Sequence, residues 1–149
     1  MCGITGIASS NAKISREWVE HCNNLQRHRG PDNAGYWISD DSKIILGHQR
    51  LSIIDLSNSG NQPMSDNKES IIITFNGEIY NYRELRNTLS QTGYKFKTAT
   101  DTEVIIAAYK FWGIDFLEKL NGMFAIAIVD MQNKKLFLCR DRVVGKPLY

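Results

Sequence analysis

The sequence has no concentration of charge of either sign and no long apolar stretch. Its 18 basic and 16 acidic residues leave a formal net charge of +2. Binding to nucleic acid or to an acidic membrane usually comes with a dense basic block, so neither partner is predicted. No window reaches the ~18 apolar residues of a membrane helix, and the N-terminus has no apolar signal core. We therefore expect a cytoplasmic protein.

Cysteine and metal-ligand patterns are also scarce. The three cysteines, Cys2, Cys22 and Cys139, match neither a disulfide framework nor a CxxC zinc site, so we interpret them as reduced thiols. The histidines lack metal-ligand spacing, and no HExxH motif occurs. Phosphate-binding loops of the P-loop or GxGxxG kind are absent. The chain itself is therefore expected to hold no metal and no cofactor.

The length and composition fit one compact domain. A chain of 149 residues can bury a sizeable core without disulfides or metals. Short runs rich in Ile and Val alternate with a few helical stretches, which favours an α+β or layered α/β architecture. Runs that are apolar on both faces, such as Ile71–Ile73, indicate sheets covered on both sides. The predicted strands are Gly3–Ala8, Gly35–Ser39, Ile44–Gly47, Ile71–Phe75, Met123–Asp130 and Leu136–Cys139.

The first predicted helix begins near Ser15, a residue type that favours the N-cap position. Trp18, Cys22 and Leu25 follow at helical spacing. This spacing puts the three side chains on one face of the helix, as expected for a helix that packs on a core.

Two further helices are expected in the middle of the chain. One covers Arg83–Thr92 and is ended by Gly93. The other follows Thr100-x-x-Glu103, a capping-box pattern that leads into an apolar stretch. Asp101 is therefore predicted to lie at a helix N-terminus.

Cys2 is the most informative single residue. A small second side chain followed by Gly3 favours removal of Met1, which would give Cys2 both a thiol and a free α-amine. An α-amine has a pKa of about 8, so near neutral pH it can accept the thiol proton without a histidine. Cys2 would then combine nucleophile and base. The alternative is a small buried cysteine on a first strand, which is the commoner situation for these residues alone.

A buried strand runs directly into Asn76–Gly77. A thiolate that attacks an amide creates an oxyanion, which needs preorganised neutral donors. If the strand ends here, the Asn76 side-chain amide and the Gly77 backbone N–H can supply two. The alternative is an ordinary Asn-Gly turn between two strands, which is the more frequent role of this dipeptide taken alone.

Arg50 lies inside a strand-like, largely apolar stretch. A guanidinium group matches a carboxylate in a bidentate way, so the α-carboxylate of a free amino acid is a candidate ligand. The α-ammonium group of such a substrate would need an acid, for which Asp101 and Glu78 are the candidates. An internal salt bridge for Arg50 and helix capping by Asp101 remain alternatives.

Five segments carry these features: Met1–Ile4, Arg27–Asp32, His48–Ile53, Asn76–Asn81 and Arg140–Arg142. In order and spacing they resemble the class II glutamine amidotransferase domain, over essentially the whole chain. Within that superfamily, the Arg-Gly-Pro-Asp and Asn-Gly-Glu-Ile-Tyr-Asn variants are similar to those of the glutamine-hydrolysing asparagine synthetases. The final Lys-Pro-Leu-Tyr is similar to theirs as well.

The resemblance implies an α+β, N-terminal-nucleophile hydrolase fold with four layers, α-β-β-α, around two stacked antiparallel sheets. It also implies that residues 1–149 are a glutaminase domain that hydrolyses L-glutamine. Cys2 would form a γ-glutamyl thioester with its own α-amine as base, and Asn76 and Gly77 would form the oxyanion hole. Arg50 would hold the α-carboxylate, with Asp101 and Glu78 on the α-ammonium side. The backbone lining of the pocket would come from Leu51, Ser52, Ile53 and Ile54.

In proteins of this kind, ammonia passes to a C-terminal synthetase domain that uses ATP and Mg to amidate aspartate. No Ser-Gly-Gly-x-Asp-Ser loop occurs here, and the chain stops at Tyr149, short of the usual end of the glutaminase domain. We therefore expect an incomplete glutaminase domain whose partner in the full-length protein is the synthetase domain, where ATP and Mg would bind. A homodimer is left open.

The chain departs from the family at Val144–Gly145, where the family usually has glycine first and a bulkier residue second. This departure puts the conformation of that turn in question, and with it the coupling between domains. Two alternative functions also stay open. One is a non-catalytic domain of the same fold, and the other is amide hydrolysis of another substrate, such as a penicillin or a bile-salt conjugate.

Overall fold

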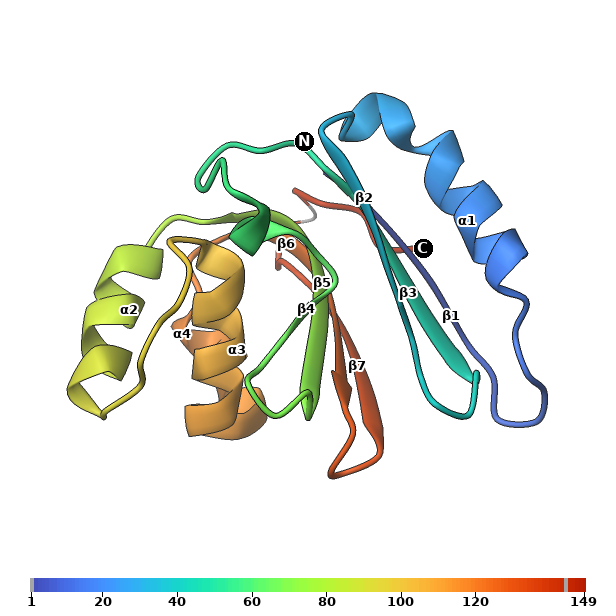
Figure 1. The fold of residues 1–149 in the computed structure, drawn as a ribbon. Helices are drawn as coiled ribbons and strands as arrows, with labels where there is room; N and C mark the ends of the chain where they lie inside the picture. The colour runs from blue at the N-terminus through green and yellow to red at the C-terminus, as the bar shows by residue number, and fades with distance from the viewer. Residues whose placement is uncertain (1, 144) are drawn as a thin grey trace.

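The computed structural model describes residues 2–143 and 145–149. Two antiparallel sheets face each other, with helix α1 (Arg16–Leu25) outside one sheet and helices α2 (Tyr82–Gln91) and α3 (Asp101–Trp112) outside the other (Figure 1). The layers therefore run α-β-β-α, and the predicted α+β fold with two stacked antiparallel sheets is confirmed. The first sheet has the order β1-β3-β2, with β1 Gly3–Ala8, β2 Asn33–Ile38 and β3 Ile44–Arg50. The second has the order β4-β5-β6-β7, with β4 Met64–Ser65, β5 Ile71–Ile79, β6 Gly122–Asp130 and β7 Lys135–Arg140.

Four α-helices and three short 3-10 helices complete the described chain. The first helix expected in the middle of the chain begins and ends one residue before its predicted bounds, and Gly93, with φ of 94°, follows its C-cap Thr92. The second begins directly after Thr100, as predicted. No helix in the described part of the chain is long and apolar enough to cross a membrane. The α-helices are α1 Arg16–Leu25, α2 Tyr82–Gln91, α3 Asp101–Trp112 and α4 Phe116–Lys119, and the 3-10 helices are Arg27–Arg29, Asn58–Gly60 and Gly113–Asp115.

Helix α1 packs through a different face from the predicted one. Trp18 and Leu25 are 57% and 65% exposed, whereas Val19 and Asn23 are fully buried. A polar contact accounts for this difference, because the Asn23 side-chain amide donates a hydrogen bond to the backbone carbonyl of His48 on β3 at 3.3 Å. A buried asparagine thus orients the helix on the first sheet, and apolar spacing alone does not reveal this.

The N-terminus of α3 forms one of the two hydrogen bonds of the predicted capping box. The Thr100 hydroxyl accepts a hydrogen bond from the Glu103 backbone N–H at 3.2 Å. The reciprocal half is replaced, because the Glu103 carboxylate accepts from the backbone N–H groups of Lys97 and Thr98 at 2.9 and 2.6 Å. Glu103 therefore holds the segment that leads into the helix, and Asp101 lies at the helix N-terminus as predicted.

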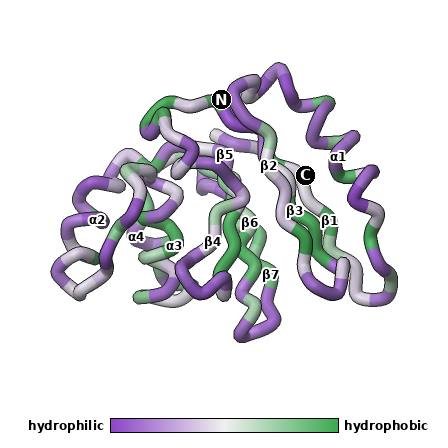
Figure 2. The backbone as a smooth tube through the Cα atoms, viewed as in Figure 1, coloured by the Kyte–Doolittle hydropathy of each residue, from purple (hydrophilic) through white to green (hydrophobic). Residues whose placement is uncertain are grey.

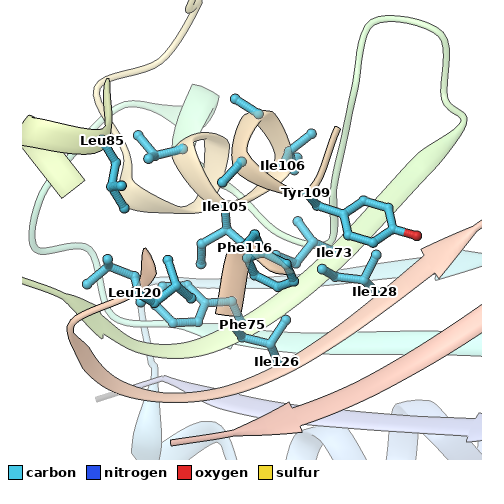
Figure 3. Packing of buried hydrophobic residues seen from close by; sticks show 14 of the residues in the cluster. Ile73, Phe75, Leu85, Ile105, Ile106, Tyr109, Phe116, Leu120, Ile126 and Ile128 are labelled. Carbon is cyan, nitrogen blue, oxygen red and sulfur yellow. The ribbon is translucent and has the colours of Figure 1, made fainter. Parts of the chain in front are cut away.

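The main core lies between the second sheet and helices α2, α3 and α4 (Figure 3). Phe116 is fully buried there and meets the ring of Tyr109 edge-on, with ring centroids 5.9 Å apart. A smaller apolar cluster, which includes Leu46 and Ile72, lies between the two sheets. Much of the hydrophobic backbone accordingly lies along the central strands of the two sheets, such as β3 and β6 (Figure 2). The doubly covered β-strands expected from sequence are present.

Candidate active site

Cys2 lies directly before β1, on the sheet that also carries Arg50. The antiparallel register pairs Gly3 with Gln49, which brings Cys2 to the end of β3. The Leu51 backbone N–H donates to the Cys2 Sγ at 3.4 Å, and the thiol in turn points to the Leu51 carbonyl at 3.7 Å. The thiol is half-buried and free. The predicted loss of Met1 concerns a residue outside those described.

A cavity of about 100 Å³ opens beside this thiol. It is lined by every predicted site residue except Ser52. The Ser52 backbone N–H instead donates to the Asp32 carboxylate at 2.7 Å, which anchors the loop from outside the lining. Of the predicted residues 51–54, three line this cavity and Ser52 does not. The lining residues that were predicted are Cys2, Arg50, Leu51, Ile53, Ile54, Asn76, Gly77, Glu78 and Asp101.

Asn76 and Gly77 lie within a strand, contrary to both sequence-based interpretations. Strand β5 neither ends at Phe75 nor turns at Asn-Gly, but continues to Ile79 in register with β6. Gly77 pairs with Phe124, and a Cβ atom at this position would overlap the backbone carbonyl of Met123. Glycine is thus required by close packing against β6, and the pairing of the strands overrides the turn preference of the dipeptide.

The Gly77 backbone N–H points away from β6. On the other edge of β6, the Phe124 N–H donates to the Asp141 carboxylate and the Phe124 carbonyl accepts from the Asp141 N–H, directly after β7. Gly77 and Phe124 therefore form a non-hydrogen-bonded pair in the antiparallel ladder. On the same edge of β5, the Phe75 N–H donates to Gln62 at 2.7 Å and the Ile79 N–H to Asp101 at 3.1 Å. Between these two satisfied donors, the Gly77 N–H faces the cavity.

The Asn76 side chain adds a second donor to the same place. It is 8% exposed and lines the cavity. Among the described residues, none forms a hydrogen bond with its amide group. A buried amide and an open backbone N–H side by side are the arrangement that stabilises an oxyanion.

Arg50 is held by neutral oxygens. Its Nη1 donates to the Ser57 carbonyl and to the Asn61 side-chain oxygen, both at 2.8 Å, and its Nη2 donates to the Asp55 carbonyl. Within the described chain no carboxylate forms an ion pair with Arg50, so the internal salt bridge considered above is absent there. Arg50 as a whole is 6% exposed, and it forms part of the cavity wall.

Asp101 and Glu78 form the acidic side of the cavity. Asp101 is 5% exposed, and burial raises its pKa to about 6, against the hydrogen bond from Ile79 and with a further rise from the charge of Glu78. Glu78 is solvent-exposed. At neutral pH this part of the cavity lining therefore carries negative charge, which suits a positively charged ligand group.

Other lining residues were not predicted from the sequence. Gln62 accepts from the Phe75 N–H and donates to the Thr102 hydroxyl at 3.2 Å, which ties β5 to α3 directly behind the cavity. Asp55 and Lys146 also line it. Asp55 carried a local signal, because the Asp-x-Ser spacing with Ser57 is typical of a turn closed by the aspartate side chain.

Hydrogen bonds between side chains and backbone join the two sheets next to the site. The buried imidazole of His48 on β3 lies 3.2 Å from the Phe75 carbonyl on β5. Burial lowers the pKa of His48 to about 4, so the ring is neutral at pH 7 and donates from Nε2. The Thr74 hydroxyl on β5 donates to the Gly47 carbonyl on β3 at 3.3 Å. These bonds set the position of Asn76 relative to the sheet that carries Cys2.

The segment after β7 is organised by one carboxylate. Asp141 accepts hydrogen bonds from the backbone N–H groups of Val143, Gly145 and Lys146, at 3.1, 2.8 and 3.0 Å. This network places Lys146 in the lining. The departure from the family noted above involves Val144, which lies outside the described residues, so only its Gly145 part is seen here. A second cavity of about 850 Å³, lined largely by apolar residues of both sheets, shares Cys2, Asn76 and Lys146 with the first.

The composition of the site points to covalent chemistry on an amide. Over residues 2–143 and 145–149, no cluster of His, Cys, Asp or Glu side chains is placed to hold a metal ion. What the cavity offers is a thiol, two neutral donors, a guanidinium and a buried acid. The α-β-β-α fold and this set of groups fit the class of amidotransferases.

Comparison with known proteins gives the family. The sequence model of the glutamine amidotransferase domain matches residues 1–149, and the chain belongs to this family. In the solved structures, glutamine phosphoribosylpyrophosphate (PRPP) amidotransferase from B. subtilis, complexed with ADP and GMP, matches 93% of this chain and 37% of its own with a TM-score of 0.78. The two are 22% identical, so this likeness shows the fold, and it confirms the predicted N-terminal-nucleophile fold.

Several curated relatives are more similar in sequence. A putative glutamine-hydrolyzing asparagine synthetase 2 from Methanocaldococcus jannaschii is 39% identical over 165 residues, and glutamine-hydrolyzing asparagine synthetase 2 from Bacillus subtilis is 44% identical over 153. Amidase chry2 from Gibberella zeae is 40% identical over 160 residues. All of this chain is matched in each case, but only 32%, 20% and 24% of the relatives. The chain thus spans between a fifth and a third of their length.

Proposed function

We propose that the chain hydrolyses L-glutamine to L-glutamate and ammonia through a thioester on Cys2. The observation that carries this proposal is the composition of one small cavity. Its lining includes the Cys2 thiol and two donors, on Asn76 and Gly77, that have no other hydrogen-bond partner in the described chain. It also has a positive group at one wall and a negative group at another. A glutamine molecule offers a matching set: an amide to attack, an α-carboxylate and an α-ammonium group.

The reaction follows from these groups in two steps. The α-amine of Cys2, free once Met1 is removed, takes the thiol proton, and the thiolate attacks the side-chain amide carbon of glutamine. The developing oxyanion accepts hydrogen bonds from the Asn76 amide and the Gly77 N–H. The C–N bond breaks, the departing nitrogen takes up the proton, and ammonia leaves. Water then attacks the thioester and releases glutamate, which regenerates the thiol.

Binding of glutamine would use the two charged walls. Arg50 binds the α-carboxylate with the N–H groups that remain after its three bonds to the surrounding loop. Asp101 in its ionised form binds the α-ammonium group, and Glu78 adds negative charge nearby. Leu51, Ile53 and Ile54 close the cavity around the aliphatic part of the substrate.

The test compares Cys2→Ala with the unchanged chain. Glutamate and ammonia release from glutamine are expected to fall to background in Cys2→Ala, while Cys22→Ala, another half-buried free thiol, retains the activity. Intact mass must show the loss of Met1 in the active protein. Glutamate release by Cys2→Ala equal to that of the unchanged chain would refute the proposal. Retention of Met1 in an active chain would refute the role of the α-amine.

We further propose that the ammonia is supplied to a synthetase part of a longer protein, for the ATP-dependent conversion of aspartate to asparagine. The names and the greater length of the relatives support this. ATP and Mg would bind in that synthetase part. The test is asparagine formation from aspartate, ATP and glutamine by a gene product that continues beyond Tyr149. Formation of a different amide would refute aspartate as the acceptor.

A second candidate is hydrolysis of another amide, and one relative is named an amidase. The pair of charged walls favours a free amino acid over an acylated one. N-acetylglutamine lacks the α-ammonium charge that Asp101 would bind, so it is expected to react much more slowly than glutamine. Equal turnover of the two compounds would favour the second candidate.

A further inference from the structure

Asp55 lies at the middle of the loop formed by residues 51–61, which runs from the end of β3 along the cavity. Its two carboxylate oxygens bind different parts of the chain. Oδ1 accepts from the backbone N–H and the hydroxyl of Ser57, at 2.9 and 2.6 Å. Oδ2 accepts from the backbone N–H of Ala99, 44 residues away, at 3.1 Å. One side chain therefore connects two segments that are distant in sequence.

The first of these segments holds the arginine. The Ser57 carbonyl accepts from Arg50 Nη1 at 2.8 Å, and the Asp55 carbonyl accepts from Arg50 Nη2. By fixing Ser57, the Asp55 carboxylate fixes the backbone oxygens to which the guanidinium is bonded. The position of the positive wall of the cavity thus depends on Asp55.

The second segment leads to the buried acid. Ala99 lies two residues before Asp101, between Thr98 and Thr100, whose hydroxyls lie 2.8 Å apart. Within the described residues, the bond from Ala99 to Asp55 is the only hydrogen bond between residues 51–61 and residues 97–101. Gln62 and Thr102, which directly follow these two segments, form a second link at 3.2 Å. The Asp55 carboxylate therefore supplies one of the two side-chain bonds that set the position of the negative wall relative to the positive one.

The charge of Asp55 suits this task. Hydrogen bonds from Ser57 and Ala99, together with the nearby charge of Arg50, hold the pKa of Asp55 below its usual range. The carboxylate is therefore ionised at neutral pH, and a charged acceptor makes stronger hydrogen bonds than a neutral one.

We propose that Asp55 is a positioning residue that sets the distance between the two charged ends of the glutamine site. This inference rests on the proposed function and deepens it. A substrate that carries its carboxylate and its ammonium group on the same carbon must meet Arg50 and Asp101 at once. A fixed distance between these residues therefore selects such a substrate over compounds that carry only one of the charges.

The experiment compares three amides in the wild-type chain and in Asp55→Asn. They are glutamine, glutaramic acid, which lacks the α-ammonium group, and 4-aminobutanamide, which lacks the α-carboxylate. The side-chain amide introduced by this substitution has one acceptor oxygen and one NH₂ group. It can therefore replace the bond from Ser57 or the bond from Ala99, but not both. We expect kcat/KM for glutamine to fall about tenfold, as for the loss of one charge-assisted hydrogen bond. The loss should lie in KM, and kcat/KM for each one-charge compound should change less than about twofold.

The matched control is Asp41→Asn. Asp41 accepts from the Ser39 hydroxyl and the Lys43 N–H at 2.7 and 3.1 Å, in the turn between β2 and β3, away from the cavity. This variant loses comparable hydrogen bonds and is expected to keep the wild-type preference for glutamine. A preference unchanged in Asp55→Asn, or lost equally in both variants, overturns the role of Asp55.

A smaller substitution, Ser57→Ala, tests the same role if Asp55→Asn does not fold. Ser57→Ala removes the hydroxyl bond to Asp55 from an exposed residue and should lower the preference for glutamine by about threefold. If Asp55→Asn does not fold, an unchanged preference in Ser57→Ala overturns the inference. Glutamate formation by the wild-type chain that does not depend on Cys2 would refute the proposed function, and the role of Asp55 with it. Cys2-dependent activity with an unchanged preference refutes only the role of Asp55.

Discussion

The ionised side chain of Asp101 is predicted to lower the stability of the folded chain, and Asp101→Asn tests this. Its pKa is about 6 in the folded state against 3.8 for a free aspartate, chiefly because of burial. Ionising it therefore costs the folded state on the order of 3 kcal/mol. An asparagine keeps an oxygen for the Ile79 N–H and is never ionised. The substitution should stabilise the protein at pH 8 while it weakens glutamine binding.

The stability advantage of Asp101→Asn over the wild type should grow as the pH rises. Below about pH 3.8 the aspartate is neutral in both states, so wild type and variant should be equally stable. The stability that the neutral carboxyl provides is lost as the pH rises from 3.8 through 6, because the unfolded chain ionises first. The advantage of the variant should reach about half its full size near pH 5 and all of it above pH 6.

Urea unfolding at pH 5 and pH 8, followed by circular dichroism, measures this difference. A gain of about 3 kcal/mol would raise the melting temperature of a chain of this size by on the order of 10 °C at pH 8. Asp41→Asn is the control, because hydrogen bonding holds the pKa of this exposed carboxyl below its usual value, and its removal should not stabilise. A variant no more stable than wild type at pH 8, or equally more stable at both pH values, would refute burial as the cause.

Two further substitutions test the site and the core. Asn76→Ala should lower kcat by about 10²-fold or more with a smaller effect on KM, since the amide acts on the oxyanion; a loss confined to KM in steady-state kinetics would contradict this. Phe116→Ala should lower the free energy of unfolding by about 3–5 kcal/mol, because the fully buried ring is replaced by a cavity; urea unfolding with a loss under about 1 kcal/mol would show that the core refills.

The local sequence pattern predicted the bounds of helices and strands well where neighbouring residues determine them. The bounds of β1 match the predicted Gly3–Ala8, and α3 begins where the Thr100 cap places it. The pattern was wrong where a distant partner decides. Strand β5 passes through Asn76–Gly77 because β6 pairs with it along its whole length. The packed face of α1 follows a buried asparagine, which an apolar spacing rule excludes from a core.

The candidate site was predicted in its residues rather than in its geometry. The motifs identified Cys2, Arg50 and Asp101, which the fold brings to one cavity. The direction of the Gly77 N–H depends on the phase of a ladder that involves β6 and β7, which no local pattern specifies. The link from Asp55 to Ala99 spans 44 residues, so only the three-dimensional structure reveals it.

The thiol and the two donors proposed to bind the oxyanion stand on different sheets, so the proposed chemistry requires both sheets to be in place. Cys2 adjoins the first sheet, whereas Asn76 belongs to the second, and the polar bonds beside them join β3 to β5. An intermediate with one sheet formed has a thiol without donors or donors without a thiol. Under the proposed function, amide cleavage would therefore report that the two sheets have docked.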